Sequence, residues 1–327
     1  MGRYLLTGAA GFIGSRVAEL LLERGDTVLG VDNLNDAYDV RLKQWRLDRL
    51  LTSDRFHFRR LDITDRPALD AFFREAAATP VDAIINLAAR AGVRYSVIDP
   101  WVYLDTNATG TLNLLENARV HGIGKFVLAS TSSLYGADNP MPYSEDARTD
   151  RPLSPYAASK KAAEALCFTY HYLYAIDVSV LRYFTVYGPA GRPDMSLFRF
   201  VQWISEDRPV LVYGDGTQQR DFTFVDDVAR GTVAALRPLG YDVINLGSDQ
   251  PIVLAAAVRL VEELLGRRAR IERRPRHPAD VHATWADIGK AGRLLEWRPE
   301  VPFATGVRTL VDWYAENREW ARDVPTD

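Results

Sequence analysis

The chain has 327 residues, of which 47% are hydrophobic and 25% charged, and this length and composition predict a globular protein of about two domains. Its 40 lysines and arginines against 43 aspartates and glutamates give a net charge of -3, which excludes a global basic field for nucleic acid or an anionic membrane. The single cysteine, Cys167, excludes an internal disulfide framework, and no apolar run approaches the roughly 18 residues of a membrane span. The N-terminus has no signal-peptide pattern, and we therefore expect a cytoplasmic protein.

Short apolar runs alternate with longer amphipathic segments from the first residue onward. They predict strands over residues 4–7, 27–31, 56–61, 83–87, 125–130 and 178–183, and helices over 12–24, 36–51, 66–77, 103–119 and 156–174. This alternation predicts an α/β fold with a Rossmann-like, doubly wound parallel sheet that helices cover on both faces.

The rhythm loosens after residue 183, where turn signals separate short strands from helices predicted over 196–205 and 254–265. We expect a first domain over 1–183 and a smaller, mixed α/β domain mainly over 184–327. A further strand predicted at 243–246 could join the sheet of the first domain. We therefore expect residues 222–247 to belong to the first domain as well, so that the two domains are interleaved along the chain.

Three glycines mark the turn from the first strand to the first helix, in Thr7-Gly8-Ala9-Ala10-Gly11-Phe12-Ile13-Gly14. Glycines at such a turn let the backbone approach a pyrophosphate, which then lies at the positive N-terminus of the helix. The spacing is GxxGxxG rather than the GxGxxG of the usual dinucleotide motif. Taken alone, the triplet is also compatible with a tight turn that packs closely on the helix.

The end of the second strand supports the dinucleotide interpretation. Asp32 follows Gly14 by eighteen positions, where a carboxylate accepts the hydroxyls of an adenosine ribose and repels a 2′-phosphate. We therefore predict NAD, with NADP kept as an alternative because Arg41 and Lys43 follow closely. Asp62 and the segment 87–89 end the next strands at the same carboxyl edge, where such folds bind ligands.

A catalytic group is predicted from two further segments. Tyr156 and Lys160 are spaced i, i+4 on one helix face, and a strand ends in Ser130-Thr131-Ser132-Ser133. A base that removes a proton from a sugar hydroxyl near neutrality requires the tyrosine pKa to fall by roughly 3 units from 10. Lys160 and a positively charged nicotinamide would favour the phenolate, and Thr131 would hydrogen-bond the reacting hydroxyl.

These motifs together resemble the extended short-chain dehydrogenase/reductase family over essentially the whole chain. A closer likeness, to the UDP-glucuronate 4-epimerases, is carried by the segments 91–96, 181–189 and 191–195. The resemblance implies that Thr131, Tyr156 and Lys160 are catalytic. It also implies a redox-neutral reaction, in which Tyr156 removes the proton of the 4-hydroxyl, carbon 4 gives its hydride to NAD, and the hydride returns to the other face of the 4-keto sugar.

The expected cofactor contacts combine the motifs with this resemblance and lie in the first domain. They are Gly8, Gly11, Phe12, Ile13, Gly14, Asp32, Asn33, Asn35, Lys43, Asp62, Ile63, Leu87, Ala88, Ala89, Asn107, Ser130, Tyr156, Lys160 and Tyr183.

The sugar carboxylate is expected to meet hydroxyl groups and one arginine. Ser132 and Ser133 stand where related 4,6-dehydratases and uronate decarboxylases carry acidic residues, and hydroxyls there favour epimerisation. Thr185 stands where many neutral-sugar epimerases carry Asn, and Arg192 or Arg94 is the expected cationic partner. The alternative for Arg192 is a charge that only stabilises its turn.

For the UDP group, the resemblance implies Tyr213 under the uracil, Arg220 at the phosphates and Asp280 on the ribose. His277 departs from the Gln or Arg usual three residues before that aspartate. We expect the substrate to be a UDP-uronate.

Two alternative functions stay open, and we expect neither a nucleic-acid site nor a metal site. The alternatives are a neutral-sugar UDP-glucose 4-epimerase and a non-catalytic NAD-binding sensor. The arginine-rich run 267–276 is interpreted as a solvated rim rather than a nucleic-acid site, and no metal site is predicted. The aromatic residues of the helix 156–174, namely Phe168, Tyr170, Tyr172 and Tyr174, are expected in the interface of a homodimer.

Overall fold

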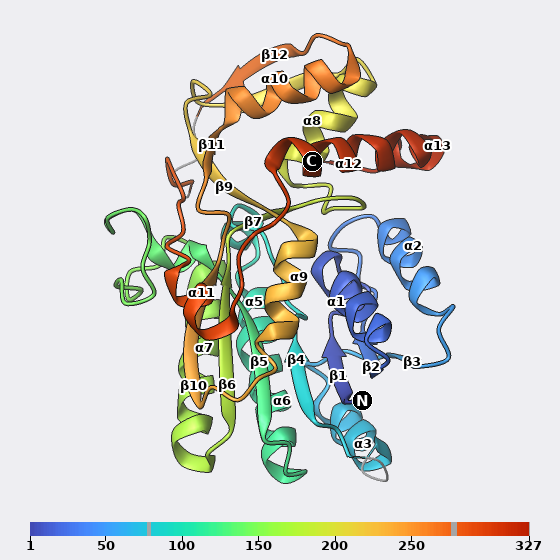
Figure 1. The fold of residues 1–327 in the computed structure, drawn as a ribbon, viewed down its shortest axis with the longest axis vertical. Helices are drawn as coiled ribbons and strands as arrows, with labels where there is room; N and C mark the ends of the chain where they lie inside the picture. The colour runs from blue at the N-terminus through green and yellow to red at the C-terminus, as the bar shows by residue number, and fades with distance from the viewer. Residues whose placement is uncertain (77–79, 276–279, 327) are drawn as a thin grey trace.

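The computed structural model describes residues 1–76, 80–275 and 280–326. Its main sheet contains seven parallel strands in the order β10-β6-β5-β4-β1-β2-β3 (Figure 1). These strands are β1 (Arg3–Thr7), β2 (Thr27–Asp32), β3 (Phe56–Arg60), β4 (Ala83–Asn86), β5 (Lys125–Thr131), β6 (Asp177–Tyr183) and β10 (Tyr241–Leu246). The order reverses between β1 and β4, and ligands of such sheets bind at the carboxyl ends beside this reversal.

Both faces of the sheet are buried along its central strands, where neighbouring residues enter different hydrophobic clusters. Leu6 packs in a cluster with Val17 of α1 and Val228 of α9, whereas Leu5 packs with Leu114 of α6 on the other face. The helices that cover the sheet are α1 (Phe12–Glu23), α2 (Val40–Leu50), α3 (Arg66–Ala76), α6 (Gly110–Val120), α7 (Pro155–Tyr174) and α9 (Val225–Ala234). The predicted α/β class and Rossmann-like sheet are confirmed.

The later part of the chain forms smaller sheets beyond one end of the main sheet, at the top of Figure 1. One has the order β11-β9-β7 and the other pairs β12 with β8. Their strands are β7 (Thr185–Tyr187), β8 (Pro209–Tyr213), β9 (Gln219–Phe224), β11 (Pro251–Val253) and β12 (Arg270–Arg274). The helices of this part are α8 (Ser196–Ser205), α10 (Leu254–Leu265), α11 (Gly289–Leu295), α12 (Phe303–Glu316) and α13 (Arg318–Ala321).

Two predicted helices differ from the structure. The helix expected over 36–51 begins at Val40, because the Asp39 side chain accepts a hydrogen bond from the Arg41 amide and caps the helix. The helix expected over 103–119 is divided into α5 (Trp101–Tyr103), a π-helical turn η1 (Leu104–Thr109) and α6. A short helix, α4 (Tyr95–Ile98), precedes them, and a 3-10 turn, η2 (Ser132–Tyr135), follows β5.

The chain returns to the main sheet after β9. Helix α9 packs on α1, and β10 then pairs in parallel with β6 from Tyr241 opposite Val178 to Leu246 opposite Tyr183. Within the described ranges, no helix combines the length and apolar character needed to cross a bilayer.

Candidate active site

The glycine turn at the end of β1 is built for close backbone approach. Gly8 has a φ of +69°, and a Cβ on it would lie 2.7 Å from the Ala88 nitrogen. A Cβ on Gly14 would lie 2.0 Å from the carbonyl oxygen of Gly8, so a side chain at this position would clash with backbone. No side chain caps α1 at Gly11, which leaves the helix N-terminus for an anion. The turn therefore fits the diphosphate of a dinucleotide.

The carboxylate of Asp32 lies directly behind this turn. It accepts hydrogen bonds from the Ala10 amide at 3.2 Å and from the Leu34 amide at 2.8 Å. Beside it, Lys43 is buried and its Nζ donates to Asn35 Oδ1 at 2.9 Å, while burial lowers the pKa of the lysine. The Lys43 ammonium is thus held within the loop that follows β2, and the carboxylate at the strand end suits a ribose without a 2′-phosphate.

Asp62 lies at the next strand end and joins the same edge. Burial raises its pKa, but hydrogen bonds from Thr64 and from Asn33 Nδ2 outweigh burial and hold the pKa below its usual value. Ile63 is buried against Gly110, and Leu87 and Ala88 follow β4 with their amides bonded to Thr7. These predicted residues therefore line one edge, with Ala89 next in the chain.

Two other predicted cofactor residues are fully engaged by the protein. Asn107 in η1 bonds to both backbone groups of Arg90 and donates to Ser159 Oγ at 2.9 Å. The Tyr183 hydroxyl is 2.8 Å from Thr232 Oγ1, and burial raises its pKa. Both side chains hold the walls of the site together, so a direct contact with the cofactor stays a prediction for each.

The predicted catalytic hydroxyls meet where β5 ends and α7 begins. Ser154 caps α7 by accepting from the Ala157 amide, which places Tyr156 in the first turn. Burial raises the pKa of Tyr156, whereas its hydrogen bond with Thr131 and the positive charge of Arg192 act in the opposite direction. Thr131 Oγ1 also lies 3.2 Å from Ser133 Oγ and accepts from the Ser133 amide at 3.1 Å.

Lys160 lies one turn further along α7 but has a different partner from the expected one. Its Nζ donates to the Ala129 carbonyl oxygen at 2.9 Å, and the cation that lowers the Tyr156 pKa is Arg192. Burial lowers the pKa of Lys160 to about 8, although Glu164 acts to raise it. Glu164 is itself paired with Arg182 at 2.9 Å and accepts from Ser130 Oγ at 2.6 Å.

The lowered pKa of Lys160 predicts a pH-dependent stability of the cofactor-free protein. Below pH 8 the folded chain holds a buried charged lysine, and each unit of pKa depression costs about 1.4 kcal/mol. Between a folded pKa of about 8 and an ordinary value of 10.5, the unfolded chain binds more protons, so stability rises with pH in this window. Lys160→Met should therefore raise the melting temperature at pH 7, and the gain should shrink as the pH approaches 10.

The control for this prediction is Lys161→Met, because Lys161 is the next residue and its side chain is 40% exposed. Thermal melts of the three proteins between pH 7 and 10 would decide it. A Lys160→Met gain that stays constant over this range would contradict a depressed lysine pKa.

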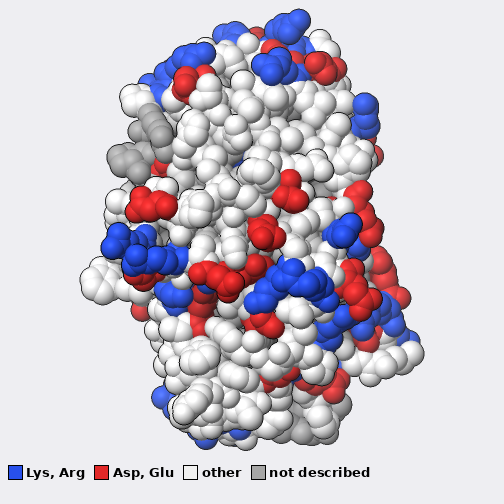
Figure 2. All heavy atoms as spheres, turned by 60° about the vertical axis from the view of Figure 1, so that its left-hand side comes forward, with Lys and Arg blue, Asp and Glu red and all other residues white. Residues whose placement is uncertain are grey.

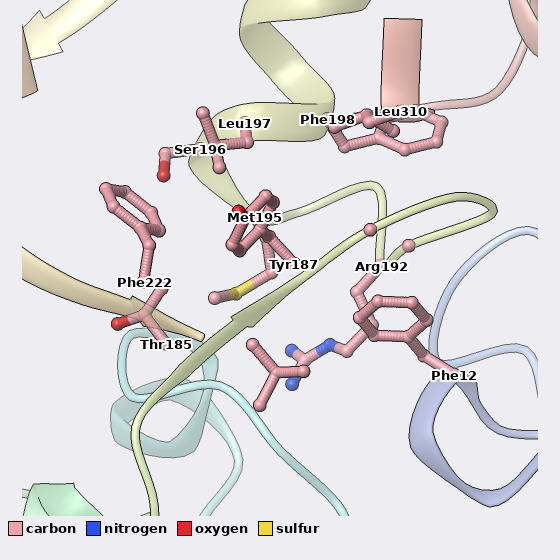
Figure 3. Close-up of a pocket in the computed structure, with 13 residues that line it drawn as sticks. Phe12, Thr185, Tyr187, Arg192, Met195, Ser196, Leu197, Phe198, Phe222 and Leu310 are labelled. Carbon is pink, nitrogen blue, oxygen red and sulfur yellow. The ribbon is translucent and has the colours of Figure 1, made fainter. Parts of the chain in front are cut away.

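Arg192 projects into a small pocket that also contains Thr185, Phe12 and Met195 (Figure 3). Its guanidinium forms two bonds to Asp194, from Nε at 3.1 Å and from Nη2 at 2.6 Å. Its positive charge also acts to lower the pKa of Tyr156, so the guanidinium lies near that phenol. The bonds to Asp194 fit the turn-stabilising alternative, and the contact of Arg192 with a sugar carboxylate stays a prediction.

Arg94 lies elsewhere, with the residues predicted for the uridine. Its guanidinium stacks 3.9 Å from the centre of the Tyr213 ring, and Nη2 bonds to Asp280 Oδ2 at 2.6 Å. Arg220 lies in β9, the strand after the one that carries Tyr213, and donates to the carbonyl oxygens of Gln219 and His282. Arg94 and Arg192, the two arginines predicted to bind the sugar carboxylate, therefore lie in different parts of the site, and Arg192 is the one near Tyr156. His277 lies outside the described residues.

Charges on the surface are mixed in sign. Figure 2 shows lysines and arginines interspersed with aspartates and glutamates on the face it presents. In the run 267–276, Arg268 pairs with Glu262 at 3.7 Å and Arg270 with Asp207 at 3.4 Å, while Arg276 lies outside the described residues. These pairs support the solvated-rim interpretation.

Sequence reasoning missed two residues that shape the site. The Tyr103 ring packs edge-on against Tyr156 with centroids 6.0 Å apart, and Arg46 is buried behind the glycine turn. The spacing of Arg46 with Leu42 and Leu50, which places it on the apolar face of its helix, is the signal that could have identified it, but its partners are far away in the sequence.

Comparison with known proteins places this geometry among related enzymes. Residues 4–247 match the model of the NAD dependent epimerase/dehydratase family. A UDP-glucuronate 4-epimerase of Thermodesulfobacterium geofontis is 56% identical over 325 residues, which cover 99% of each chain.

Two solved structures are similar along almost their whole length. The UDP-glucuronic acid 4-epimerase of Bacillus cereus, in complex with UDP-glucuronic acid and NAD, has a TM-score of 0.90 and 37% identity, with 96% of this chain and 99% of that chain covered. The UDP-glucose 4-epimerase of Thermotoga maritima, with UDP-glucose, has a TM-score of 0.89 and 30% identity, with coverage of 97% and 99%.

Proposed function

Because the chain belongs to the NAD-dependent epimerase/dehydratase family, we propose that it interconverts UDP-glucuronate and UDP-galacturonate by inverting carbon 4, with NAD as its cofactor. The observation that carries the proposal is the hydrogen bond between buried Thr131 and Tyr156 at the carboxyl edge of the sheet, with Arg192 acting on the same tyrosine. The likeness to a UDP-glucuronate 4-epimerase over 99% of the chain supports the choice of sugar.

The chain's own residues move and hold the proton of the reacting hydroxyl. Tyr156 accepts the proton of the 4-hydroxyl, and Thr131 orients that hydroxyl through its own Oγ1. In the substrate-free protein the raised pKa keeps the phenol protonated, so positive charge must accumulate near it before it acts as a base. Of the two cations predicted near this phenol, Arg192 acts on it, while Lys160 on the same helix donates to the Ala129 carbonyl oxygen. Bound NAD supplies the chemistry of taking a hydride from carbon 4 and returning it.

The cofactor is held by the edge that β1, β2, β3 and β4 present. The glycine turn receives the diphosphate, and Asp32 receives the ribose hydroxyls. We assign this binding to a domain of residues 1–183 together with 222–247, since α9 and β10 complete the main sheet. Residues 184–327 otherwise bind the nucleotide sugar.

The outcome at carbon 4 follows from what surrounds carbons 5 and 6. Ser132 and Ser133 follow Thr131, and their hydroxyl groups can donate hydrogen bonds to a carboxylate. Hydroxyl groups are poor acids and bases for the loss of water or carbon dioxide from the sugar. Arg192 then forms a charge-assisted bond to the uronate carboxylate. The site consequently inverts the sugar without dehydrating or decarboxylating it.

The proposal is tested by incubating the purified protein with NAD and, separately, with UDP-glucuronate or UDP-glucose. Chromatography and mass spectrometry should show an equal-mass UDP-galacturonate from the first substrate and much less UDP-galactose from the second. Selective conversion of UDP-glucose would favour the neutral-sugar epimerase, carbon dioxide release would favour a decarboxylase, and no reaction would favour a non-catalytic NAD-binding protein.

The enzyme acts as a homodimer in the cytoplasm. Large apolar side chains are exposed on two adjoining elements, and examples are Trp101 of α5 at 72% and Tyr172 of α7 at 77%. Phe168 and Tyr174 are exposed on the same helix, whereas Tyr170 is buried in its own chain and donates to Glu116, so it adds little to this surface. A second copy of the chain would cover this apolar surface. The lone Cys167 is buried, which suits a reducing compartment.

If this surface forms the dimer interface, charged side chains placed on it should halve the mass of the particle in solution. Trp101→Glu combined with Tyr172→Glu should convert a dimer to a monomer in light scattering after size exclusion, because each burial would desolvate a carboxylate. Ile271→Glu is the control, since Ile271 is 48% exposed on β12, away from this surface. A wild-type monomer, or a dimer that survives the double change, would contradict the interface.

A further inference from the structure

Arg46 of α2 is a buried cation whose five N–H groups all have acceptors. Nε and Nη2 donate to the Ala190 carbonyl oxygen at 3.1 and 2.5 Å, and Nη2 also reaches the Gly191 carbonyl oxygen at 3.5 Å. Nη1 donates to the Ala10 carbonyl oxygen at 3.1 Å and to the Tyr38 hydroxyl at 2.8 Å. The side chain is only 2% exposed, so these bonds replace its hydration completely.

The first of the two segments that Arg46 joins is the cofactor turn. Ala10 lies between Gly8 and Gly11, and its amide is bonded to Asp32 while its carbonyl is bonded to Arg46. The peptide groups of the turn are therefore held from both sides. Phe12 follows directly, and the Arg46 guanidinium lies 5.8 Å from the centre of its ring.

The second segment immediately precedes Arg192. Ala190 has a φ of +48°, a backbone conformation that costs free energy for a residue with a Cβ and needs surrounding bonds to hold it. Arg46 provides such bonds to Ala190 and Gly191, the two residues before Arg192. Gly191 also packs on Phe12, since a Cβ on it would lie 3.7 Å from Phe12 Cζ.

We propose that Arg46 is a positioning residue that joins the cofactor turn to the turn carrying Arg192, so that one buried guanidinium sets both NAD affinity and the preference for a sugar carboxylate. The second half of this proposal rests on the function proposed above. A buried arginine among neutral oxygens loses hydration without the attraction of a carboxylate, and an apolar side chain would fill the same space at lower cost. Its bonds are accounted for by the two functional segments that it connects, at Ala10, 36 residues before it, and at Ala190, 144 residues after it.

The first arm of the test measures cofactor binding without any substrate. Arg46→Met keeps the length and apolar packing of the side chain but removes all five donors. Titration of NAD into the cofactor-free protein should show a dissociation constant raised by about tenfold, because the Ala10 carbonyl loses a charge-assisted bond. Arg46→Lys keeps the charge with fewer, differently placed donors, and should show an intermediate value.

The second arm measures the ratio of the dissociation constants of UDP-glucose and UDP-glucuronate for the NAD-loaded protein. Arg46→Met should lower this preference for the uronate by about tenfold. In an Arg192→Met background, the further change of Arg46 should leave the ratio unaltered, because the effect acts through Arg192.

The matched control is Lys125→Met. Lys125 is a buried cation at the amino end of β5, bonded to Asp177, Ser179 and the Arg237 carbonyl, and it lies far from the carboxyl edge. The Lys125→Met variant should have a lower melting temperature, with unchanged NAD affinity and an unchanged ratio of the UDP-glucose and UDP-glucuronate dissociation constants. Arg46 variants that resemble it, with a lower melting temperature and both binding measures unchanged, would overturn the proposal, as would a ratio effect that persists without Arg192. A wild-type protein that does not epimerise UDP-glucuronate would contradict the proposed function, and the NAD arm would still decide the role of Arg46 at the cofactor turn.

Discussion

Tyr156→Phe should lower the epimerisation rate by about three orders of magnitude while the protein still binds NAD. The change removes the hydroxyl that takes the substrate proton, a contribution of about 10²- to 10⁴-fold for general bases. The ring remains and keeps its edge-on contact with Tyr103. Turnover of UDP-glucuronate and NAD titration on the same preparation would measure both effects.

Tyr170→Phe is the matched control, because Tyr170 lies on the same helix and the chemical change is identical. Its hydroxyl bonds to Glu116 on α6, away from Thr131. We expect this variant to retain turnover within a few-fold of wild type. Near-normal turnover of Tyr156→Phe, or loss of NAD from it, would remove Tyr156 from its proposed role.

Arg192→Met should weaken the enzyme far more for UDP-glucuronate than for UDP-glucose. A charge-assisted bond to the carboxylate is worth about 1.5 to 3 kcal/mol, which corresponds to a loss of about 10- to 100-fold in kcat/KM for the uronate. UDP-glucose has a neutral group at carbon 6 and loses no such bond. The comparison therefore isolates the carboxylate from the rest of the substrate.

Arg94→Met provides the control for this selectivity. Arg94 stacks on Tyr213 and pairs with Asp280, at the end of the site proposed for the uridine that both substrates share. Its loss should change kcat/KM for the two sugars by the same factor. Equal losses in Arg192→Met would instead return Arg192 to a turn-stabilising role with Asp194.

Much of the fold could be predicted because local patterns carry it. Buried parallel strands are short apolar runs, and the helices between them repeat apolar residues at helical spacing, so the first six strands of the main sheet were placed within one or two residues. The carboxyl-edge rule then brought Gly8, Asp32, Asp62 and Thr131 to one edge of the sheet. The prediction could not place the π-helical turn η1, since its helical spacing differs from an α-helix only locally.

The parts of the site that could not be predicted depend on contacts between distant segments. Lys160 was expected beside Tyr156, but its four-carbon side chain reaches the Ala129 carbonyl instead. Nothing in the sequence near Arg46 indicates that its acceptors lie at Ala10 and Ala190. Spacing along one helix predicts which residues share a face, whereas the partner of a long side chain depends on how the other elements pack around it.

The central claim is that carbon 4 loses its hydrogen and regains the same hydrogen on the opposite face. The most direct measurement uses UDP-glucuronate with deuterium at carbon 4, incubated with the protein and NAD until epimers equilibrate, followed by mass spectrometry and NMR of the products. The account predicts UDP-galacturonate of equal mass with deuterium still on carbon 4. Loss of the label to solvent, loss of the carboxyl group as carbon dioxide, or recovery of unchanged substrate alone would contradict it.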